Sequence, residues 1–351
     1  MESRAILVTI RYVAKKAGVS VAIVSKALND YPDVSPKTKQ RILEIAKEMN
    51  YSPNIVAKNL SSKKQKTIGL ITSGFLNTEG KDDSNVFDLF KGVYTAAEEN
   101  QYEFAIYLTD TIKQKQKSYA KFCRERNIGG AVLMGIRVDD PYFTELLDTK
   151  IPCVLVDIYV EEARKHIGSV STNNVDASYE MTTYLLDKNH RNIAVMAGSK
   201  AAYVNERRLM GVEKAFREYG LDLQESNILY GNFSEEEAYS LSKEYLEHVE
   251  EMPTAFICFS DLMAYGVMKA VKEKGLKIPD DISVTGFDGL PINEFTNPPL
   301  TTVNQDFYEI GRQAALLLQE LIENNDVDKR RYVPHQIVER ESVQTLRELE
   351  T

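Results

Sequence analysis

Cysteine, histidine and long apolar runs are all scarce in this chain of 351 residues. Its three cysteines, Cys123, Cys153 and Cys258, form no C-x-x-C pair, which excludes the usual thiolate zinc and redox motifs. Cys153 and Cys258 lie inside short apolar runs, so we expect them to be small core residues. No stretch approaches the roughly 18 apolar residues of a membrane-spanning helix, and the apolar start at residues 5–10 is too short for a signal peptide. We therefore expect a cytoplasmic protein that does not contact a membrane.

Catalytic motifs are absent as well. The four histidines do not have the spacing of a metal-binding motif such as H-E-x-x-H, and the chain contains no Walker loop and no G-x-S-x-G elbow. The sequence therefore predicts no catalytic residue, no cofactor and no metal. With 43% hydrophobic and 27% charged residues, the composition is typical of a globular protein, and the length suggests two or three domains.

Charge is unevenly distributed along the chain. Residues 1–66 hold 13 Lys and Arg against 5 Asp and Glu, a net charge of +8, whereas the remaining residues carry −17. A basic segment of this kind is expected to meet a polyanion such as nucleic acid, which would repel the acidic remainder. A merely solvated basic surface is the alternative.

The basic segment predicts three short helices. Thr9 and Ser20 are placed to cap the first two, Gly18 supplies the turn between them, and Ser35 followed by Pro36 is a strong start signal for the third. Three helices around a small core, the first two joined by a glycine turn, describe a helix-turn-helix domain. The expected helices cover residues 10–16, 21–28 and 36–49.

In a helix-turn-helix domain the second helix enters the major groove of double-stranded DNA, and its N-terminal residues meet the base edges. Ser20 stands where the helix dipole favours phosphate, and Val21 and Ala22 are small enough to meet thymine methyl groups. Ser25 and Lys26, one turn further, are placed to contact phosphate or guanine. Plain helix filling is the alternative for Val21 and Ala22.

Three segments of the basic region carry a family resemblance. They read TIRYVAKKAGVSVAIVSKALN at residues 9–29, VSPKT at 34–38 and NYSPN at 50–54. Together they resemble the DNA-binding domain of the lactose-repressor and galactose-repressor family. The resemblance implies a homodimer on a pseudo-palindromic DNA operator. It adds four DNA-contacting positions, Thr9, Asn29, Tyr51 and Asn54.

The segment NIVAKNLS at residues 54–61 resembles the hinge helix of the same family. That helix folds on the operator, and the resemblance places Ala57 and Leu60 at the DNA, with Leu60 as an apolar wedge in the minor groove. Eight residues are too few for a stable isolated helix, which agrees with folding on binding. A simple linker is the alternative. We assign the helix-turn-helix domain to residues 1–53 and the hinge helix and linker to residues 54–66.

From residue 67 onward, short aliphatic runs alternate with longer helical stretches. This βαβ rhythm predicts an α/β fold, with parallel sheets covered by helices on both faces, and about 280 residues are enough for two doubly wound lobes. The expected strands are 67–71, 103–108, 131–134, 153–156, 193–196, 255–259 and 283–286. The expected helices are 88–100, 177–188, 207–219, 235–249 and 261–274.

Sequence landmarks extend the resemblance over this acidic region. They include TIGL at 67–70, IPCVLVD at 151–157, RLMG at 208–211, GNFSEE at 231–236, SDLMAYG at 260–266 and VTGFD at 284–288. These segments resemble the periplasmic-binding-protein-like core of the family, in which the chain crosses three times between two lobes and an effector binds in the cleft. The resemblance implies a core at 67–344, with a first lobe of about 67–163 and 304–331, a second lobe of about 164–303 and 332–344, and a tail at 345–351.

Four residues of the acidic region suit the hydroxyl groups of a sugar. Asp157 and Asp288 each end an apolar run and so stand at strand ends, Arg208 opens an expected helix, and Phe233 offers a stacking face. The alternative for the two aspartates is that they only cap the segments that follow. The family resemblance places effector contacts at the same four positions. It adds two further effector contacts, Ser260 and Phe307.

These patterns together predict a sequence-specific transcriptional regulator, in particular a repressor, controlled by a small-molecule effector such as a sugar. A solute-binding protein of transport would share the two lobes, but the missing signal peptide and the basic segment argue against it. A cytosolic sugar-binding protein or enzyme with an accessory basic domain is the third hypothesis, and turnover of a bound ligand would distinguish the enzyme.

Overall fold

The chain divides into two compact units, Met1–Gln65 and Lys66–Thr351. The computed structural model describes residues 8–28, 30–51, 66–73, 84–160 and 164–347.

The first unit is a bundle of three short helices. They are α1 (Ile10–Ala17), α2 (Val21–Leu28) and α3 (Pro36–Glu48), and their bounds agree with the predicted ones within one residue. One face of each helix points to the centre, where Val13, Val24 and Ile42 are fully buried. The bundle confirms the predicted helix-turn-helix arrangement.

The helix ends follow from four predicted local signals, three of which act as expected. Gly18 has a φ of 63° and makes the turn between α1 and α2. Ser20 Oγ accepts the Ile23 N–H at 3.3 Å, and Ser35 caps α3 in the same way. Thr9 precedes α1, but its side chain makes no capping hydrogen bond, so that part of the prediction is wrong.

The second unit alternates strands and helices. Its strands are β1 (Thr67–Ser73), β2 (Glu103–Thr109), β3 (Gly130–Met134), β4 (Cys153–Val156), β5 (Ile167–Thr172), β6 (Ile193–Ala197), β7 (Ile228–Tyr230), β8 (Ala255–Cys258), β9 (Ser283–Asp288), β10 (Thr301–Gln305), β11 (Arg330–Val333) and β12 (His335–Val338). Its α-helices are α5 (Ser84–Glu99), α6 (Thr111–Gln116), α7 (Tyr119–Glu125), α8 (Pro141–Leu146), α9 (Asn174–Asp187), α10 (Tyr203–Glu218), α11 (Glu235–His248), α12 (Asp261–Glu273) and α13 (Phe307–Ile322).

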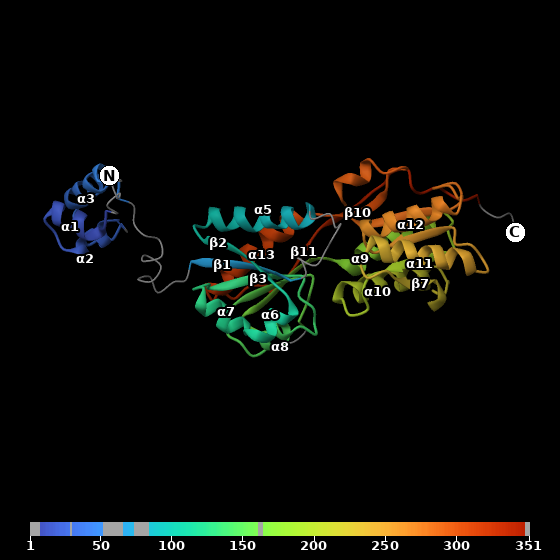
Figure 1. Cartoon of the computed structure of the whole chain (residues 1–351), viewed down its shortest axis with the longest axis horizontal. Coiled ribbons are helices and arrows are strands. Elements are labelled where there is room, and N and C mark those ends of the chain that lie inside the picture. Colours follow the sequence, from blue (N-terminus) through green and yellow to red (C-terminus); the bar gives the residue numbers. More distant parts are fainter. Residues whose placement is uncertain (1–7, 29, 52–65, 74–83, 161–163, 348–351) are drawn as a thin grey trace, which may run out of the picture. The chain divides into compact units, whose positions relative to one another are not determined.

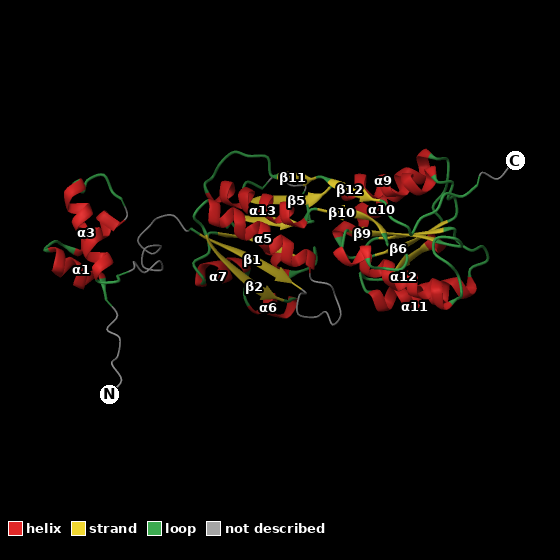
Figure 2. Ribbon diagram, turned by 90° about the horizontal axis from the view of Figure 1, so that it is seen from above, coloured by secondary structure: helices red, strands yellow, loops and turns green. Residues whose placement is uncertain are grey.

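These strands form two six-stranded sheets, one for each lobe (Figures 1 and 2). The strand orders are β11-β5-β4-β3-β1-β2 in the first lobe and β12-β10-β9-β8-β6-β7 in the second. All pairs in the first sheet are parallel, and in the second only β10 with β12 is antiparallel. The prediction of two doubly wound parallel-sheet lobes is confirmed.

The chain crosses between the lobes three times, because β5 and β11 pair within the first sheet while β6, β10 and β12 pair within the second. The crossings follow β5, β10 and β11. The expected lobe boundary between residues 163 and 164 is therefore wrong, since β5 belongs to the first lobe and the crossing comes only after Thr172. Polar residues of the candidate site, such as Asp157 and Asp288, lie at the ends of strands near these crossings.

Buried side chains cover both faces of the first sheet. Helices α5 and α13 pack side by side on one face (Figure 1), and α7 and α8 cover the other. A Cβ atom on Gly92 of α5 would lie 2.0 Å from the carbonyl oxygen of Tyr308, and one on Gly311 of α13 would lie 2.2 Å from that of Leu89. The two helix backbones therefore touch, which only glycine permits. Cys153 and Cys258 are buried, as expected of core residues.

Candidate functional site

The first turn of α2 has one exposed face. Val21 is 42% exposed and Ala22 is also exposed, whereas Val24 on the opposite face is fully buried. Ser20 lies beside them at the N-cap. Because the N-terminus of a helix offers free N–H groups and the positive end of its dipole, this surface suits contact with phosphate and base edges.

The other predicted DNA contacts differ in their surroundings. Thr9 is exposed and Ser25 is half-buried. Lys26 Nζ forms an ion pair with Asp33, and this hydrogen bond lowers the pKa of the Asp33 carboxyl. Tyr51 packs partly against the helical core, and burial raises its pKa. Four predicted contacts, Asn29, Asn54, Ala57 and Leu60, lie outside the described residues.

Arg41 holds the helical unit together in a way that no sequence pattern indicated. Its Nη2 donates to the carbonyl oxygen of Ala17 at 2.9 Å, across 24 positions of sequence. The bond ties α3 to the last turn of α1 and satisfies a carbonyl that the helix end leaves free. It supports the frame from which α2 projects.

Arg208 lies at the centre of a polar cluster in the second unit. Arg208 is only 4% exposed to solvent. Its Nε donates to Asn174 Oδ1 at 2.8 Å, its Nη1 donates to the carbonyl oxygen of Phe259, and Nη1 lies 4.0 Å from Asp288 Oδ1. Helix α10 begins at Tyr203, so Arg208 lies in its second turn. The expectation that Arg208 opens this helix is therefore wrong.

The two predicted aspartates lie at strand ends, as expected. Asp157 follows β4 with a φ of 63°, and Asp288 ends β9 with a φ of 124°. Ser171 Oγ donates to Asp157 Oδ1 at 2.6 Å, and Asn174 Nδ2 donates to Ser171 Oγ at 3.1 Å. A continuous polar series thus runs from Asp157 in the first lobe through Asn174 to Arg208 in the second.

Burial dominates the electrostatics of this cluster. It raises the pKa of Asp288 to about 8, although Arg208 lowers that pKa and the hydrogen bond from Gln305 Nε2, 2.9 Å long, lowers it too. Burial also raises the pKa of Asp157 and lowers the pKa of Arg208. Near neutral pH the Asp288 carboxyl is therefore largely protonated, so it can both donate and accept hydrogen bonds, as sugar hydroxyls require.

The remaining predicted effector residues have other contacts. Phe233 is half-buried, and a Cβ atom on Gly198 would lie 2.0 Å from its ring, so the ring packs directly on the backbone after β6. Ser260 is buried, and its Oγ caps α12 by accepting the Met263 N–H at 3.2 Å. Phe307 is 8% exposed and belongs to the first-lobe core. Capping and core packing account for the last two, and effector contact at them stays a prediction.

Asp261 is a third buried carboxyl group, which sequence reasoning missed. It accepts hydrogen bonds from Leu290 N at 2.7 Å, Asn293 Nδ2 at 2.8 Å and Thr302 Oγ1 at 2.6 Å. Burial raises its pKa to about 6, against the lowering effect of these bonds. Asp261 thereby fixes the loop that directly follows Asp288. One sequence signal could have identified Asp261, namely its position directly after the apolar run of β8 and Ser260.

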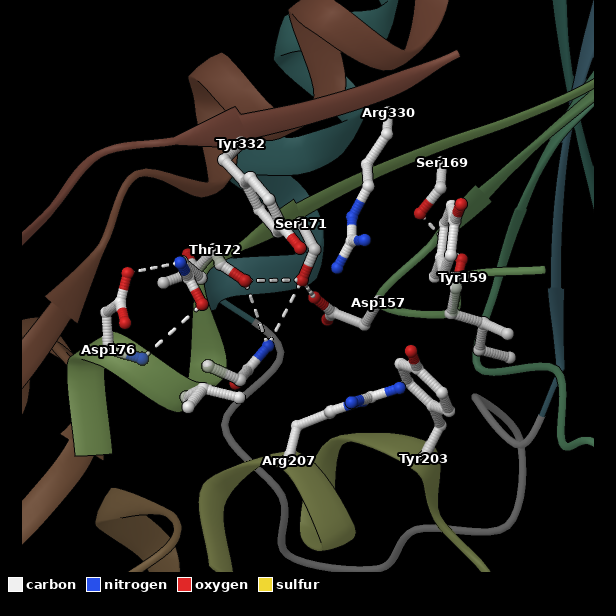
Figure 3. Close-up of a pocket in the computed structure, with 14 residues that line it drawn as sticks. Asp157, Tyr159, Ser169, Ser171, Thr172, Asp176, Tyr203, Arg207, Arg330 and Tyr332 are labelled. Atoms are coloured by element: carbon white, nitrogen blue, oxygen red, sulfur yellow. Dashed lines mark hydrogen bonds between the residues drawn. The ribbon is translucent and has the colours of Figure 1, made fainter. Parts of the chain in front are cut away.

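A cavity of about 230 Å³ opens beside Asp157 (Figure 3). Strand ends of β4 and β5, the first turns of α9 and α10, and β11 form its walls. Tyr203, Arg207, Arg330 and Tyr332 line it, and none of them was predicted from the sequence. Its size is somewhat below the roughly 300–1,000 Å³ of common ligand pockets, so it suits a small molecule.

The described residues provide neither a metal site nor a membrane span. They contain no group of three or more His, Cys, Asp or Glu side chains placed to hold a metal ion. None of the described helices combines the length and apolar character that crossing a membrane requires.

Both units match known protein families. The model for bacterial regulatory proteins of the lacI family matches residues 9–54, and that for a periplasmic binding protein-like domain matches residues 182–343. The HTH-type transcriptional repressor PurR of Vibrio atlanticus is 33% identical over 97% of this chain and 100% of its own length. The catabolite control protein A of Priestia megaterium is 31% identical over 95% of this chain and 99% of its own.

Solved structures agree with this relationship. The lac repressor dimer bound to operator and the anti-inducer ONPF has a TM-score of 0.81 at 25% identity, covering 96% of this chain and 99% of its own. A complex of the transcriptional regulator CelR with cellobiose has a TM-score of 0.73 at 25% identity, covering 95% and 99%. Since relatives align over nearly the full length, both in the helical unit and in the two lobes, the chain belongs to the lacI family of bacterial regulatory proteins.

Proposed function

We propose that this chain is a sequence-specific transcriptional repressor whose affinity for DNA is set by a small hydroxylated effector, such as a sugar, bound at the Arg208–Asp288 cluster. The observation that carries the proposal is the combination, in one chain, of the exposed first turn of α2 with a buried polar cluster that joins both lobes. The lac repressor in the matching structure is a dimer on its operator, and CelR holds cellobiose. The lac repressor structure supports a homodimer that reads a pseudo-palindromic operator, and the CelR complex supports a sugar as the effector.

The cluster offers complementary partners for an effector rich in hydroxyl groups. Asp157 accepts hydrogen bonds, protonated Asp288 both donates and accepts, and Arg208 supplies a fixed cation. The ring of Phe233 gives a face on which a sugar ring can stack. An effector that contacts Asp157 and Arg208 together touches both lobes, so its binding changes how the lobes are held and thereby the affinity of the helical units for DNA.

DNA selection with the full chain tests the first half of this proposal. Operator sequences are selected from a random pool, and their affinity is measured by fluorescence anisotropy. In A22D the new carboxylate stabilises the first turn of α2 through the helix dipole but repels phosphate, so we expect about a hundredfold loss of affinity. The control Q40E adds one negative charge at an exposed position of α3 and should change affinity by no more than about threefold. Undiminished binding by A22D would contradict the assignment of α2.

A ligand panel tests the second half. Sugars are screened by thermal shift on the full chain, and each hit is added to the DNA-binding assay. D288N keeps the shape of the protonated carboxyl but cannot accept at both oxygens, so it should weaken the effector response by about tenfold while DNA binding without effector is retained. We also propose that the effector is not converted, and NMR of the recovered ligand should show it unchanged.

A further inference from the structure

The cavity beside Asp157 is lined by two arginines that the described part of the chain leaves without acidic partners. Arg207 comes from α10 and Arg330 from β11, and no ion pair joins either guanidinium to a described residue. In Figure 3 the two side chains enter from opposite sides of the cavity, with Asp157 between them in this view. Arg208 differs, because its donors already serve Asn174 and the Phe259 carbonyl.

Aromatic rings hold these two cations in place. The Arg207 guanidinium lies 4.8 Å from the centre of the Tyr203 ring, and that of Arg330 lies 4.0 Å from the Tyr159 ring and 4.9 Å from the Tyr332 ring. Stacking on a ring face fixes a guanidinium while leaving its N–H edges free to donate. The cavity therefore presents preoriented donors at low entropic cost.

Buried polar atoms of the same wall also lack partners. Arg207 Nε, the Tyr203 hydroxyl and Thr172 Oγ1 are each shielded from solvent and make no hydrogen bond with any residue that the structure describes. Buried polar groups are nearly always satisfied in folded proteins. All three atoms belong to groups that can donate a hydrogen bond, which indicates that a ligand with acceptor oxygens completes the site.

The two acidic residues of the cavity are already engaged. Asp157 Oδ1 accepts from Ser171 at 2.6 Å, and Asp176 accepts from Asn173 at the start of α9. No described residue donates to Asp157 Oδ2, so that oxygen can receive a ligand hydroxyl. The cavity therefore offers hydroxyl recognition at Asp157 and oxyanion recognition at the donor groups of the two arginines.

We propose that this cavity is an oxyanion subsite, so that the effector is a monosaccharide-sized molecule carrying a phosphate or a carboxylate, held by Arg207, Arg330 and Tyr203 while its hydroxyls reach Asp157. The inference rests on the proposed function, since it specifies the chemical class of that effector. Arginine forks match the geometry of both oxyanions, and the experiment distinguishes the two.

Calorimetry on the full chain with matched ligands tests the subsite. The ligands are glucose, glucose 6-phosphate and glucuronate, the corresponding galactose set, and inorganic phosphate alone. We expect an oxyanion-bearing member to bind at least about tenfold more tightly than its neutral sugar, and R207M or R330M to remove that advantage. The control R217M removes an exposed cation from the same helix α10 and should leave all affinities within about twofold.

The outcomes separate the subsite from the proposed function. Preference for phosphate over carboxylate members, or the reverse, identifies the oxyanion. Equal affinity for neutral and anionic members, anionic affinities unchanged in R207M and R330M, or no response to any anionic member would overturn the subsite. The operator selection described above uses no ligand, so its failure would instead count against the proposed function.

Discussion

The Arg208 guanidinium lies 4.0 Å from the Asp288 carboxylate, a distance that gives electrostatic attraction without a hydrogen bond. Arg208 donates its hydrogen bonds to Asn174 and the Phe259 carbonyl. Its charge therefore offsets only part of the free-energy cost of burying an ionised Asp288. The pKa of Asp288 consequently stays raised, at about 8, and the nearby carboxylate of Asp261 adds to the rise. The pair joins a permanent cation to a carboxyl that changes charge near neutral pH.

The raised pKa of Asp288 makes stability depend on pH. In the unfolded chain the carboxyl loses its proton near its ordinary pKa of 3.8, whereas the folded chain keeps it up to about pH 8. The folded state then binds more protons in this window, so the free energy of unfolding falls as pH rises, by at most about 1.4 kcal/mol per pH unit. Thermal unfolding between pH 6.5 and 8.5 should show this decline, and D288N should flatten it.

The pH window isolates Asp288 from its neighbours. Asp261, with a pKa of about 6, has mostly lost its proton above pH 6.5. Burial lowers the pKa of His190, which gives a slope of opposite sign, but this term is common to wild type and D288N. Parallel pH profiles for the two proteins would contradict the protonation of Asp288.

Much of the fold could be predicted from local patterns. Strand β4 (Cys153–Val156) and helix α2 (Val21–Leu28) have the predicted bounds, because an unbroken apolar run and a capped amphipathic stretch are strong signals. Strand β5 (Ile167–Thr172) was missed although it is fully buried, since its sequence IGSVST offers glycine and small polar residues in place of an apolar run. Its neighbours β4 and β11 supply the pairing that defines it.

The site was predicted only in part for a related reason. Asp157 and Asp288 could be found because each ends an apolar strand, and this position alone places them at a sheet edge. Arg207 and Arg330 carry no such local signal. They meet in one cavity only because β11 crosses back to pair with β5, far away in sequence, and pairing of this kind cannot be read from single segments.

Contact between Gly198 and Phe233 predicts a coupled pair. A Cβ atom at Gly198 would lie 2.0 Å from the Phe233 ring, so G198A should displace the ring, cost about 1–3 kcal/mol of stability and weaken effector binding. In an F233A background the space is empty, and the same substitution should cost little. Thermal unfolding and calorimetry of all four proteins measure the coupling. Additive effects of the two substitutions would rule out the contact.

The close approach of α5 and α13 predicts that replacing Gly92 by alanine lowers the free energy of unfolding. Helix propensity alone favours G92A by about 1 kcal/mol. A Cβ atom there would lie 2.0 Å from the Tyr308 carbonyl oxygen, so the helices must separate and we expect a net loss of about 1–3 kcal/mol. G311A, which meets the Leu89 carbonyl, should behave alike. Urea unfolding measures both, and a gain in stability would show that the helix backbones do not touch.

The hydrogen bond from Arg41 to the Ala17 carbonyl predicts how the helical unit frays. In R41M the alkyl stem remains and only this bond is lost, at a cost of about 1 kcal/mol, which should speed local opening of α1 about fivefold. Hydrogen exchange read by mass spectrometry in the full chain measures protection of Ile10–Ala17. Lys47 is exposed on the same helix α3, so K47M serves as the matched control and should leave protection unchanged. Equal exchange in both variants would mean that Arg41 does not hold α1 against α3, and the frame that presents α2 would then depend on the apolar core alone.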